Sequence, residues 1–388
     1  MGELGMASTT HRGQARRQVL IATVGATLLL AGCQTGREQP RPDPGSRPVR
    51  PVVPVDRPRN LVAVIVPTSG SDAAIGQSIA NAAKLALADS GDQSLRLTVY
   101  DSAAAGGAAG AAQRAIDDGN RLILGPLLAS DVRAAAPIAR RAEVPMVAFS
   151  NDEGVAGGGV YIMGFTPDQS IDRIVSYARS SGKGTFAALV PSGLYGERAT
   201  QAMLAAVRRS GGRITVVEPF DRSPAAVKAA AGRLRSKGSF DAVLIADAGR
   251  MAAIAAPALP RAAKLMGTEL WASDKTLGQT AALRGAWYAA APDARFNQLS
   301  VRYRTRYGRS PYRLASMGYD AVLLAVRSAK NWPVGRPFPA RGLTDKDGFS
   351  GVDGNFRFGR DGIAERLLEV RQVSATGTTI VSPAARAF

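Results

Sequence analysis

The chain has 388 residues, which is enough for two domains of ordinary size with additional segments. Hydrophobic residues make up 46% and charged residues 21%, and these proportions exclude a wholly disordered or coiled-coil chain. The 49 Lys and Arg residues outnumber the 31 Asp and Glu residues, so the net charge of +18 predicts an anionic partner.

The histidine and cysteine content excludes most catalytic and metal chemistry. His11 is the only histidine, and it lies in a segment that we expect to be removed, so the mature chain would have none. A Ser-His-Asp triad, a Cys-His pair and the usual zinc or iron sites then lack their residues. Because Cys33 is the only cysteine, no disulfide can form within the chain. We therefore expect a protein that is not an enzyme and that has neither metal nor cofactor.

The first 32 residues have the pattern of an export signal. A cluster of arginines precedes an apolar run at 19–30, and the letters Leu-Ala-Gly-Cys, which end at Cys33, follow at once. This order resembles the bacterial lipoprotein signal, which implies cleavage before Cys33 and a lipid on its sulfur. By the same resemblance, Gln34 at the next position implies the outer membrane. We expect residues 1–32 to be a signal peptide and the mature protein to be periplasmic.

Residues 33–59 are rich in proline and arginine, which is typical of an extended tether. A polyproline-type chain advances about 3.1 Å per residue, so this segment could reach on the order of 80 Å from the membrane. It could contact acidic cell-wall or lipopolysaccharide groups, or it could be only a stiff spacer.

From residue 60 onward, near-continuous apolar runs alternate with Ala-rich amphipathic stretches. Such runs are typical of strands in a parallel sheet whose two faces are both buried. The expected strands and helices form two sets of four βα units. Thr166 and Pro167 form a good helix start between the two sets, so the chain should enter a second lobe there. Strands are expected near Leu61, Leu95, Arg121, Pro145, Thr185, Ile214, Ala242 and Glu269, and helices over 75–87, 129–141, 196–210 and 224–235.

Polar residues follow several of these strands. An open parallel sheet binds ligands at the carboxyl ends of its strands, so two lobes that face one another should form a cleft for a small polar ligand. The alternative is that these loop residues only cap the next helix. The ligand-cleft candidates are Thr68, Ser69, Ser130, Ser150, Asn151, Tyr195, Asp247 and Asp274.

The carboxyl-terminal third carries the most specific pattern. Phe296, Tyr303 and Tyr307 fall on one side of an expected helix, which Gly308 can end. Three further segments complete the pattern: Gly318-Tyr319-Asp320-Ala321-Val322 in a second helix, Tyr100-Asp101 at the end of the second strand, and Leu194-Tyr195-Gly196 after the fifth. Over residues 60 to 380 it resembles the type 1 periplasmic binding protein superfamily, in its Leu/Ile/Val-binding branch.

The resemblance implies an α/β fold of two doubly wound parallel-sheet lobes joined by three crossovers. Lobe 1 would comprise 60–165 with 291–345, and lobe 2 would comprise 166–290 with 346–388. It also implies that Tyr195 lies against the ligand and that Asp274 receives a ligand ammonium group.

Two features of the expected cleft depart from the amino-acid-binding pattern. Asp152 and Glu153 would repel a ligand carboxylate beside the fourth strand unless they point away. Asp247 stands where an aromatic residue is often found, which argues against a branched aliphatic ligand.

The lipoprotein signal, the tether, the altered cleft and the Gly-rich segment 351–362 together resemble the penicillin-binding protein activator lipoproteins. This resemblance implies a non-enzymatic regulator, anchored in the outer membrane, that contacts a bifunctional peptidoglycan synthase and stimulates cell-wall assembly. The alternative is a receptor for an amino acid or another small polar solute, or for a muropeptide, that serves ABC import or sensing.

A run of arginines, from Arg302 to Arg313, is interleaved with tyrosines. It could be a docking face for an acidic partner or wall polymer, or a solvated helix face whose tyrosines pack inward. Export makes a nucleic-acid partner improbable, so we expect none.

Overall fold

A computed structural model describes residues 58–388, and their first part is built on a five-stranded sheet. The strand order is β2-β1-β3-β4-β5, and neighbouring strands are parallel throughout. Its elements are β1 (Asn60–Val66), α1 (Ala73–Ser90), β2 (Leu95–Asp101), α2 (Gly107–Asp117), β3 (Leu122–Leu124), α3 (Ala129–Arg141), β4 (Met146–Ala148) and β5 (Val160–Ile162).

The second part is built on a seven-stranded sheet in the order β15-β14-β10-β9-β8-β6-β7. Strands β6 to β10 are parallel, whereas β14 and β15 run antiparallel at one edge. Its elements are α4 (Pro167–Ser180), β6 (Thr185–Pro191), α5 (Leu194–Arg209), β7 (Arg213–Phe220), α6 (Pro224–Ser236), β8 (Ala242–Ile245), α7 (Gly249–Ala255), β9 (Lys264–Gly267), β10 (Trp287–Ala290), β14 (Glu369–Ser374) and β15 (Gly377–Ser382).

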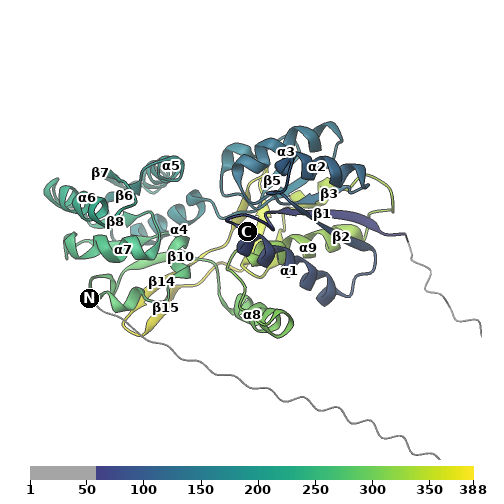
Figure 1. Cartoon of the computed structure of the whole chain (residues 1–388). Coiled ribbons are helices and arrows are strands. Elements are labelled where there is room, and N and C mark those ends of the chain that lie inside the picture. Colours follow the sequence, from purple (N-terminus) through teal and green to yellow (C-terminus); the bar gives the residue numbers. More distant parts are fainter. Residues whose placement is uncertain (1–57) are drawn as a thin grey trace, which may run out of the picture. The chain divides into compact units, whose positions relative to one another are not determined.

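The remaining elements follow β10 and belong with the first part (Figure 1). Helix α9 packs along α1, and a small antiparallel sheet follows it. The chain thus crosses between the two large sheets three times: after β5, after β10 and before β14. These elements are α8 (Ala294–Tyr307), α9 (Ala315–Ala329), β11 (Phe349–Gly351), β12 (Gly354–Phe358) and β13 (Ala364–Arg366). Short 3₁₀ helices span Glu153–Val155, Ala256–Ala258, Glu269–Ser273, Leu277–Gln279, Ala281–Leu283 and Ala340–Thr344.

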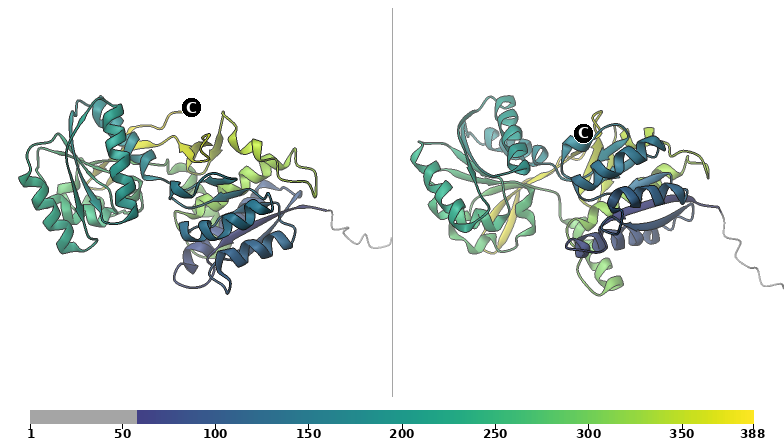
Figure 2. Two further views of the ribbon diagram at one scale, coloured as in Figure 1. Left: turned by 90° about the horizontal axis from the view of Figure 1, so that it is seen from above. Right: turned by 45° about the horizontal axis from the view of Figure 1, so that its top comes forward.

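Helices cover both faces of each large sheet (Figure 2). In β1, Val62 and Val64 pack with α1 and α9, whereas Ala63 and Ile65 pack with α2 and α3. In the second sheet, α4 and α5 cover one face and α6 and α7 cover the other. Because both faces of the central strands are buried, β1, β6 and β8 are almost entirely apolar, and this arrangement confirms the predicted doubly wound α/β fold with three crossovers.

The strand predicted at Glu269 is wrong. The strand in this region is β9 (Lys264–Gly267), and the residues Glu269–Ser273 form a 3₁₀ helix that folds back over it. Gly267 permits this close approach, since a Cβ atom there would lie 2.1 Å from the ring of Trp271. The short strands β5 and β10 were not predicted.

The segment after residue 345 also departs from the prediction, which assigned it to lobe 2. Phe349, Phe356 and Phe358 pack into the core formed by α1 and α9, so β11 to β13 belong with the first sheet. Only β14 and β15 pair with the second sheet. The contacts of 57–388 otherwise form one compact unit, and the lobe boundaries remain a prediction.

The predicted helix boundaries at the crossovers agree more closely with the structure. Helix α4 begins at Pro167 with Thr166 at the N-cap position, although the Thr166 side chain makes no capping hydrogen bond. Helix α8 ends at Gly308, which has a left-handed φ of 71°. The signal, Cys33 and most of the tether lie outside the described residues, and none of the helices in 58–388 could span a membrane.

Candidate functional site

A cavity of about 480 Å³ is lined by residues from both parts of the body. Its size suits a small molecule, and its walls contain the loops that follow β3, β4 and β9. These loops leave the carboxyl ends of parallel strands, where ligands of doubly wound sheets bind. The lining residues are Leu127, Leu128, Phe149, Asn151, Phe165, Glu269, Leu270, Ala272, Ser273, Ala291, Tyr312, Arg313, Leu314 and Met317.

The cavity walls are mostly apolar, whereas the sequence predicted a polar cleft. Its most unusual polar group is the carboxyl of Glu269, whose buried Oε2 atom has no hydrogen-bond partner. Burial raises the pKa of Glu269 to about 7, although a hydrogen bond with the Ser170 side chain opposes the rise. The carboxyl is therefore partly ionised near neutral pH and retains an acceptor for a donor group in the cavity.

Tyr195 lies close to this carboxyl and Asp247 lies close to Tyr195, but neither residue lines the cavity. The Tyr195 hydroxyl is 3.4 Å from Oγ1 of Thr268, and burial together with the nearby Glu269 raises the pKa of Tyr195 well above 10. The Arg222 guanidinium donates to Oδ2 of Asp247 at 2.8 Å. Asp247 is thus occupied by an ion pair at the edge of the site.

Asp152 does not present the repulsive charge that the sequence suggested. Arg133 pairs with its Oδ2 atom, and Arg198, on α5 of the second part, lies 3.4 Å from its Oδ1 atom. Oδ1 also accepts the backbone N–H of Gly154, and the hydroxyl of Ser150 accepts the N–H of Asp152. The carboxylate is therefore neutralised by two arginines, one from each part of the body.

Three further predicted candidates act in their own loops. The backbone N–H of Thr68 donates to Asp101, and the Ser69 side chain hydrogen-bonds to the same carboxylate. Burial opposes ionisation there, but these bonds prevail and lower the pKa of Asp101 to about 2. Asp274 accepts hydrogen bonds from the N–H and the hydroxyl of Thr276.

Of the eight sequence candidates, the structure therefore brings only Asn151 into the cavity. Ser130 is exposed on the first turn of α3 and lines no part of it. Glu269 was not predicted as a site residue, although it stands two positions after a parallel strand, because the apolar residues around it resemble a strand.

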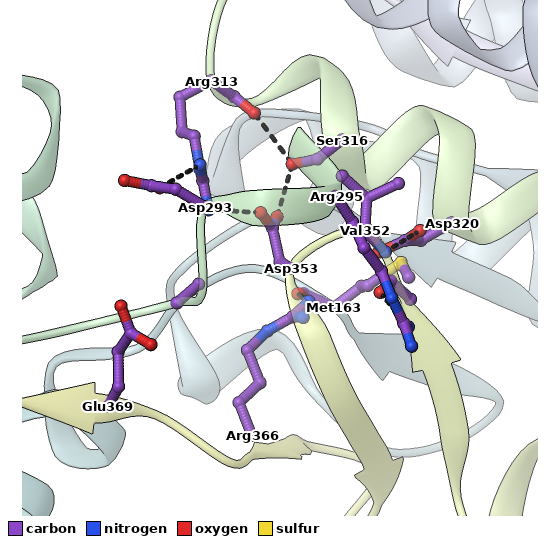
Figure 3. A network of polar contacts seen from close by, with 12 residues as sticks. Met163, Asp293, Arg295, Arg313, Ser316, Asp320, Val352, Asp353, Arg366 and Glu369 are labelled. Carbon is purple, nitrogen blue, oxygen red and sulfur yellow. Dashed lines mark hydrogen bonds and ion pairs between the residues drawn. The ribbon is translucent and has the colours of Figure 1, made fainter. Parts of the chain in front are cut away.

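Arg313 connects the cavity wall to a network of buried charges at the crossovers (Figure 3). Its guanidinium bonds Asp293 at 2.8 Å and Asp353 at 2.5 Å. Ser316 also donates a hydrogen bond to Asp353. Arg371, which lies on β14, pairs with Asp293. The start of α9 is thus tied to the second and third crossovers.

The same network holds a second carboxyl with a raised pKa. Burial, followed by the charge of Asp353, raises the pKa of Asp320 to about 7. Its Oδ1 atom accepts the N–H of Val352 at 2.7 Å. Nearby, Arg366 donates to the carbonyl of Met163, at the first crossover, at 2.6 Å (Figure 3).

The model of a protein family described as periplasmic binding protein matches residues 61–378. The chain belongs to this family. Membership indicates a periplasmic location, and the fold is that of type 1 periplasmic binding proteins of the Leu/Ile/Val-binding branch.

Solved structures share this fold at low sequence identity. A branched-chain amino acid ABC transporter protein from Rhodospirillum rubrum is 20% identical, with a TM-score of 0.71 over 83% of this chain and 100% of that one. A solute binding protein of an ABC transporter from Rhodopseudomonas palustris BisB5, in complex with 3,4-dihydroxybenzoic acid, is 21% identical. Its TM-score is 0.65, over 85% of this chain and 97% of that one.

Among curated proteins, an uncharacterized protein of Rickettsia prowazekii (strain Madrid E) is 24% identical over 169 residues. The match covers 44% of this chain and 45% of the relative, so the chain matches less than half of that protein's length.

Proposed function

We propose that this protein is a non-enzymatic periplasmic receptor that binds a small, largely apolar molecule in the cavity. The observation that carries the proposal is the buried Oε2 atom of Glu269, which lacks a hydrogen-bond partner beside mostly apolar walls. A buried acceptor without a partner costs free energy, and a ligand that donates a hydrogen bond to it removes that cost.

The cavity walls define the chemistry of the ligand. Phe149, Phe165 and Leu270 provide apolar contact surface, and the amide of Asn151 provides a second polar group. The ligand should therefore have an aromatic or aliphatic body with an ammonium or hydroxyl donor directed at Glu269. The structural neighbour in complex with 3,4-dihydroxybenzoic acid, an aromatic molecule with hydroxyl donors, supports a ligand of this kind.

A thermal shift screen of the full chain tests the proposal. The panel contains branched-chain and aromatic amino acids, hydroxybenzoic acids and muropeptides. A ligand at 100 times its dissociation constant adds about 2.7 kcal/mol, which raises the melting temperature by several degrees in a body of this size. An unchanged melting temperature with every aliphatic and aromatic compound would contradict the proposal.

As a second candidate function, we propose that the protein contacts a bifunctional penicillin-binding protein and stimulates cell-wall assembly. The support is the resemblance of the signal, the Pro/Arg tether and the segment 351–362 to the activator lipoproteins. In this proposal the lipid on Cys33 anchors the protein to the outer membrane, and the tether carries the body toward the synthase.

Two measurements test this second candidate. Mass spectrometry of the membrane-extracted protein should find acyl chains on Cys33 at the new amino terminus, and fractionation should place it in the outer membrane. The purified lipoprotein should then accelerate glycan polymerisation by the bifunctional synthase of the same cell. An unchanged rate, together with no binding to the synthase, would overturn the regulator role while leaving the receptor proposal intact.

A further inference from the structure

The segment 295–319 has a charge pattern that neither proposed function uses. It contains six arginines and neither aspartate nor glutamate, and it includes no lysine. Arg302 and Arg313 of this segment pair with carboxylates, as Arg233 does with Glu218 elsewhere in the body, whereas the other four arginines of the segment have no ion pair within 58–388. A surface that serves only solubility mixes both signs, so a cluster of one sign needs another explanation.

Within this segment, α8 separates its aromatic residues from its charges. Tyr303 is fully buried, and its hydroxyl accepts a hydrogen bond from the side-chain amide of Asn81 on α1, while the Tyr307 hydroxyl donates to the Asn81 carbonyl. The tyrosines therefore pack inward, as one of the two sequence interpretations expected. In Figure 1, α8 lies at the edge of the body, and its outer side is left uncovered.

The outer side of α8 carries charges that no carboxylate within 58–388 neutralises. Arg304 and Arg306 flank the exposed Val301 and Thr305 on the helix surface, and Arg309 follows the helix end. In contrast to Arg302, which pairs with Asp89 at 3.2 Å, these three arginines have no ion pair in the described part of the chain. We call Val301, Arg304, Thr305, Arg306 and Arg309 the arginine face.

A hollow of about 370 Å³ adjoins the arginine face. Arg309, Ser310, Pro311 and Tyr312 line it from the loop after α8, and Ala74 and Ser78 line it from α1. Tyr312 is 49% exposed and Val301 is 61% exposed, so apolar surface lies beside the cations. Arginine and tyrosine are enriched at protein interfaces, where a partner side chain inserts into such a hollow.

We propose that the arginine face and this hollow dock an acidic segment of a partner protein. Guanidinium groups bind carboxylates through two parallel hydrogen bonds, so the arginines of this face suit an acidic segment. The hollow would take an apolar side chain of the same segment, and this pairing of apolar with charged contacts favours a protein over a phospholipid headgroup. Tyr312 lines both this hollow and the ligand cavity, but the residues of the arginine face line no part of the cavity, so docking does not require the cavity to be occupied.

The test measures binding of fluorescein-labelled peptides to the full chain in detergent by fluorescence anisotropy. One peptide places glutamates around a single leucine, and its control has glutamine in place of each glutamate. The variant R304E/R306E/R309E should weaken binding of the acidic peptide roughly tenfold or more, and added salt should weaken binding to the unchanged chain. The glutamine peptide should bind neither form.

A matched control reverses the same number of charges elsewhere. Arg208, Arg213 and Arg235 are exposed, lie in the second part and have no ion pair in the described chain. R208E/R213E/R235E should therefore bind the acidic peptide nearly as the unchanged chain does. Equal losses in both triple variants, or no loss in either, would overturn the proposal.

Two further arms keep the proposal falsifiable. If R304E/R306E/R309E fails to fold by circular dichroism, R304Q/R306Q/R309Q replaces it and should show a smaller loss in the same direction. Phosphatidylglycerol vesicles should bind the chain, and R304E/R306E/R309E should reduce this binding no more than R208E/R213E/R235E does. A loss of vesicle binding specific to that variant, with no loss of peptide binding, would assign the face to a membrane and overturn the proposal.

Discussion

Glu269, in the cavity, and Asp320, in the crossover network, are carboxyl groups that burial brings to a similar pKa of about 7. Their surroundings differ in one respect. Asp320 accepts the N–H of Val352 and lies near the charges of Asp353 and Arg366, whereas Oε2 of Glu269 has no partner. The comparison teaches that a raised pKa alone does not mark a binding group. The buried oxygen of Glu269 that has no partner is the feature that separates the two.

The largest loss of stability is expected in the crossover network, which contains a buried carboxylate. Asp353 has 1% of its side chain exposed and pairs with Arg313. R313A should lower the free energy of unfolding by about 3–5 kcal/mol, because it leaves that carboxylate buried without its cation. Urea unfolding measures the loss.

The matched control for this prediction is R209A, which breaks the pair of Arg209 and Asp172. Both side chains of that pair are about half exposed, so the cost should stay below about 1 kcal/mol. Equal losses in the two variants would show that the network stabilises the crossovers no more than a surface pair does.

The next largest effect is expected on ligand binding when the carboxyl of Glu269 is replaced. In E269Q, a ligand found by the thermal shift screen should lose about 1.5–3 kcal/mol of binding free energy, which corresponds to a charge-assisted hydrogen bond. Isothermal titration calorimetry measures it. E197Q, which changes an exposed carboxylate of α5 that has no ion pair in the described chain, is the control and should bind as the unchanged chain does.

The raised pKa of Glu269 also predicts that ligand binding depends on pH. Because Glu269 loses its proton near pH 7, affinity for a donor group should rise as the pH rises through about 7 and then level off. E269Q should remove this dependence. A dependence that survives in E269Q would mean that the ligand or another group titrates.

Asp320 should affect stability and not binding. Its pKa is raised in the folded chain from 3.8 to about 7, so the folded state holds a proton that the unfolded state has lost between these values. Stability should therefore decline as the pH rises from about 4 to about 7, and D320N should flatten that decline by on the order of 1–3 kcal/mol. Urea unfolding at several pH values tests this, and a steeper decline in D320N would contradict it.

The smallest effect is expected at the ion pair that joins the two parts beside the cavity. Arg198 is 43% exposed and lies 3.4 Å from Asp152, which Arg133 also neutralises. R198A should cost less than about 1 kcal/mol in unfolding free energy. A larger loss would mean that this pair holds the two parts together.

Much of the fold could be predicted because buried parallel strands leave a strong pattern. Strand β8 is apolar from end to end, β1 and β6 are apolar after their first residue, and their helices carry clear amphipathic stripes. Strand β9 was misplaced because it begins with Lys264 and ends with Gly267, whereas the apolar letters lie in the 3₁₀ helix that follows. The three-residue strand β5 is too short to show a period.

The site was harder to predict for a physical reason. Its walls are residues such as Leu127, Phe149 and Met317, which cannot be told from core residues in a sequence. The polar loop residues that looked like ligand groups, such as Asp274 and Ser69, satisfy nearby backbone or side-chain groups instead. Which polar atom remains without a partner depends on the folded geometry, and no spacing reveals it.

The central claim is that the cavity holds a ligand donor against Glu269. A crystal structure of the chain with the compound that most raises its melting temperature tests it most directly. We expect density for the compound among Phe149, Phe165 and Leu270, with a donor atom within hydrogen-bond distance of Oε2 of Glu269. A bound compound outside the cavity, or one that leaves this oxygen without a partner, would contradict it.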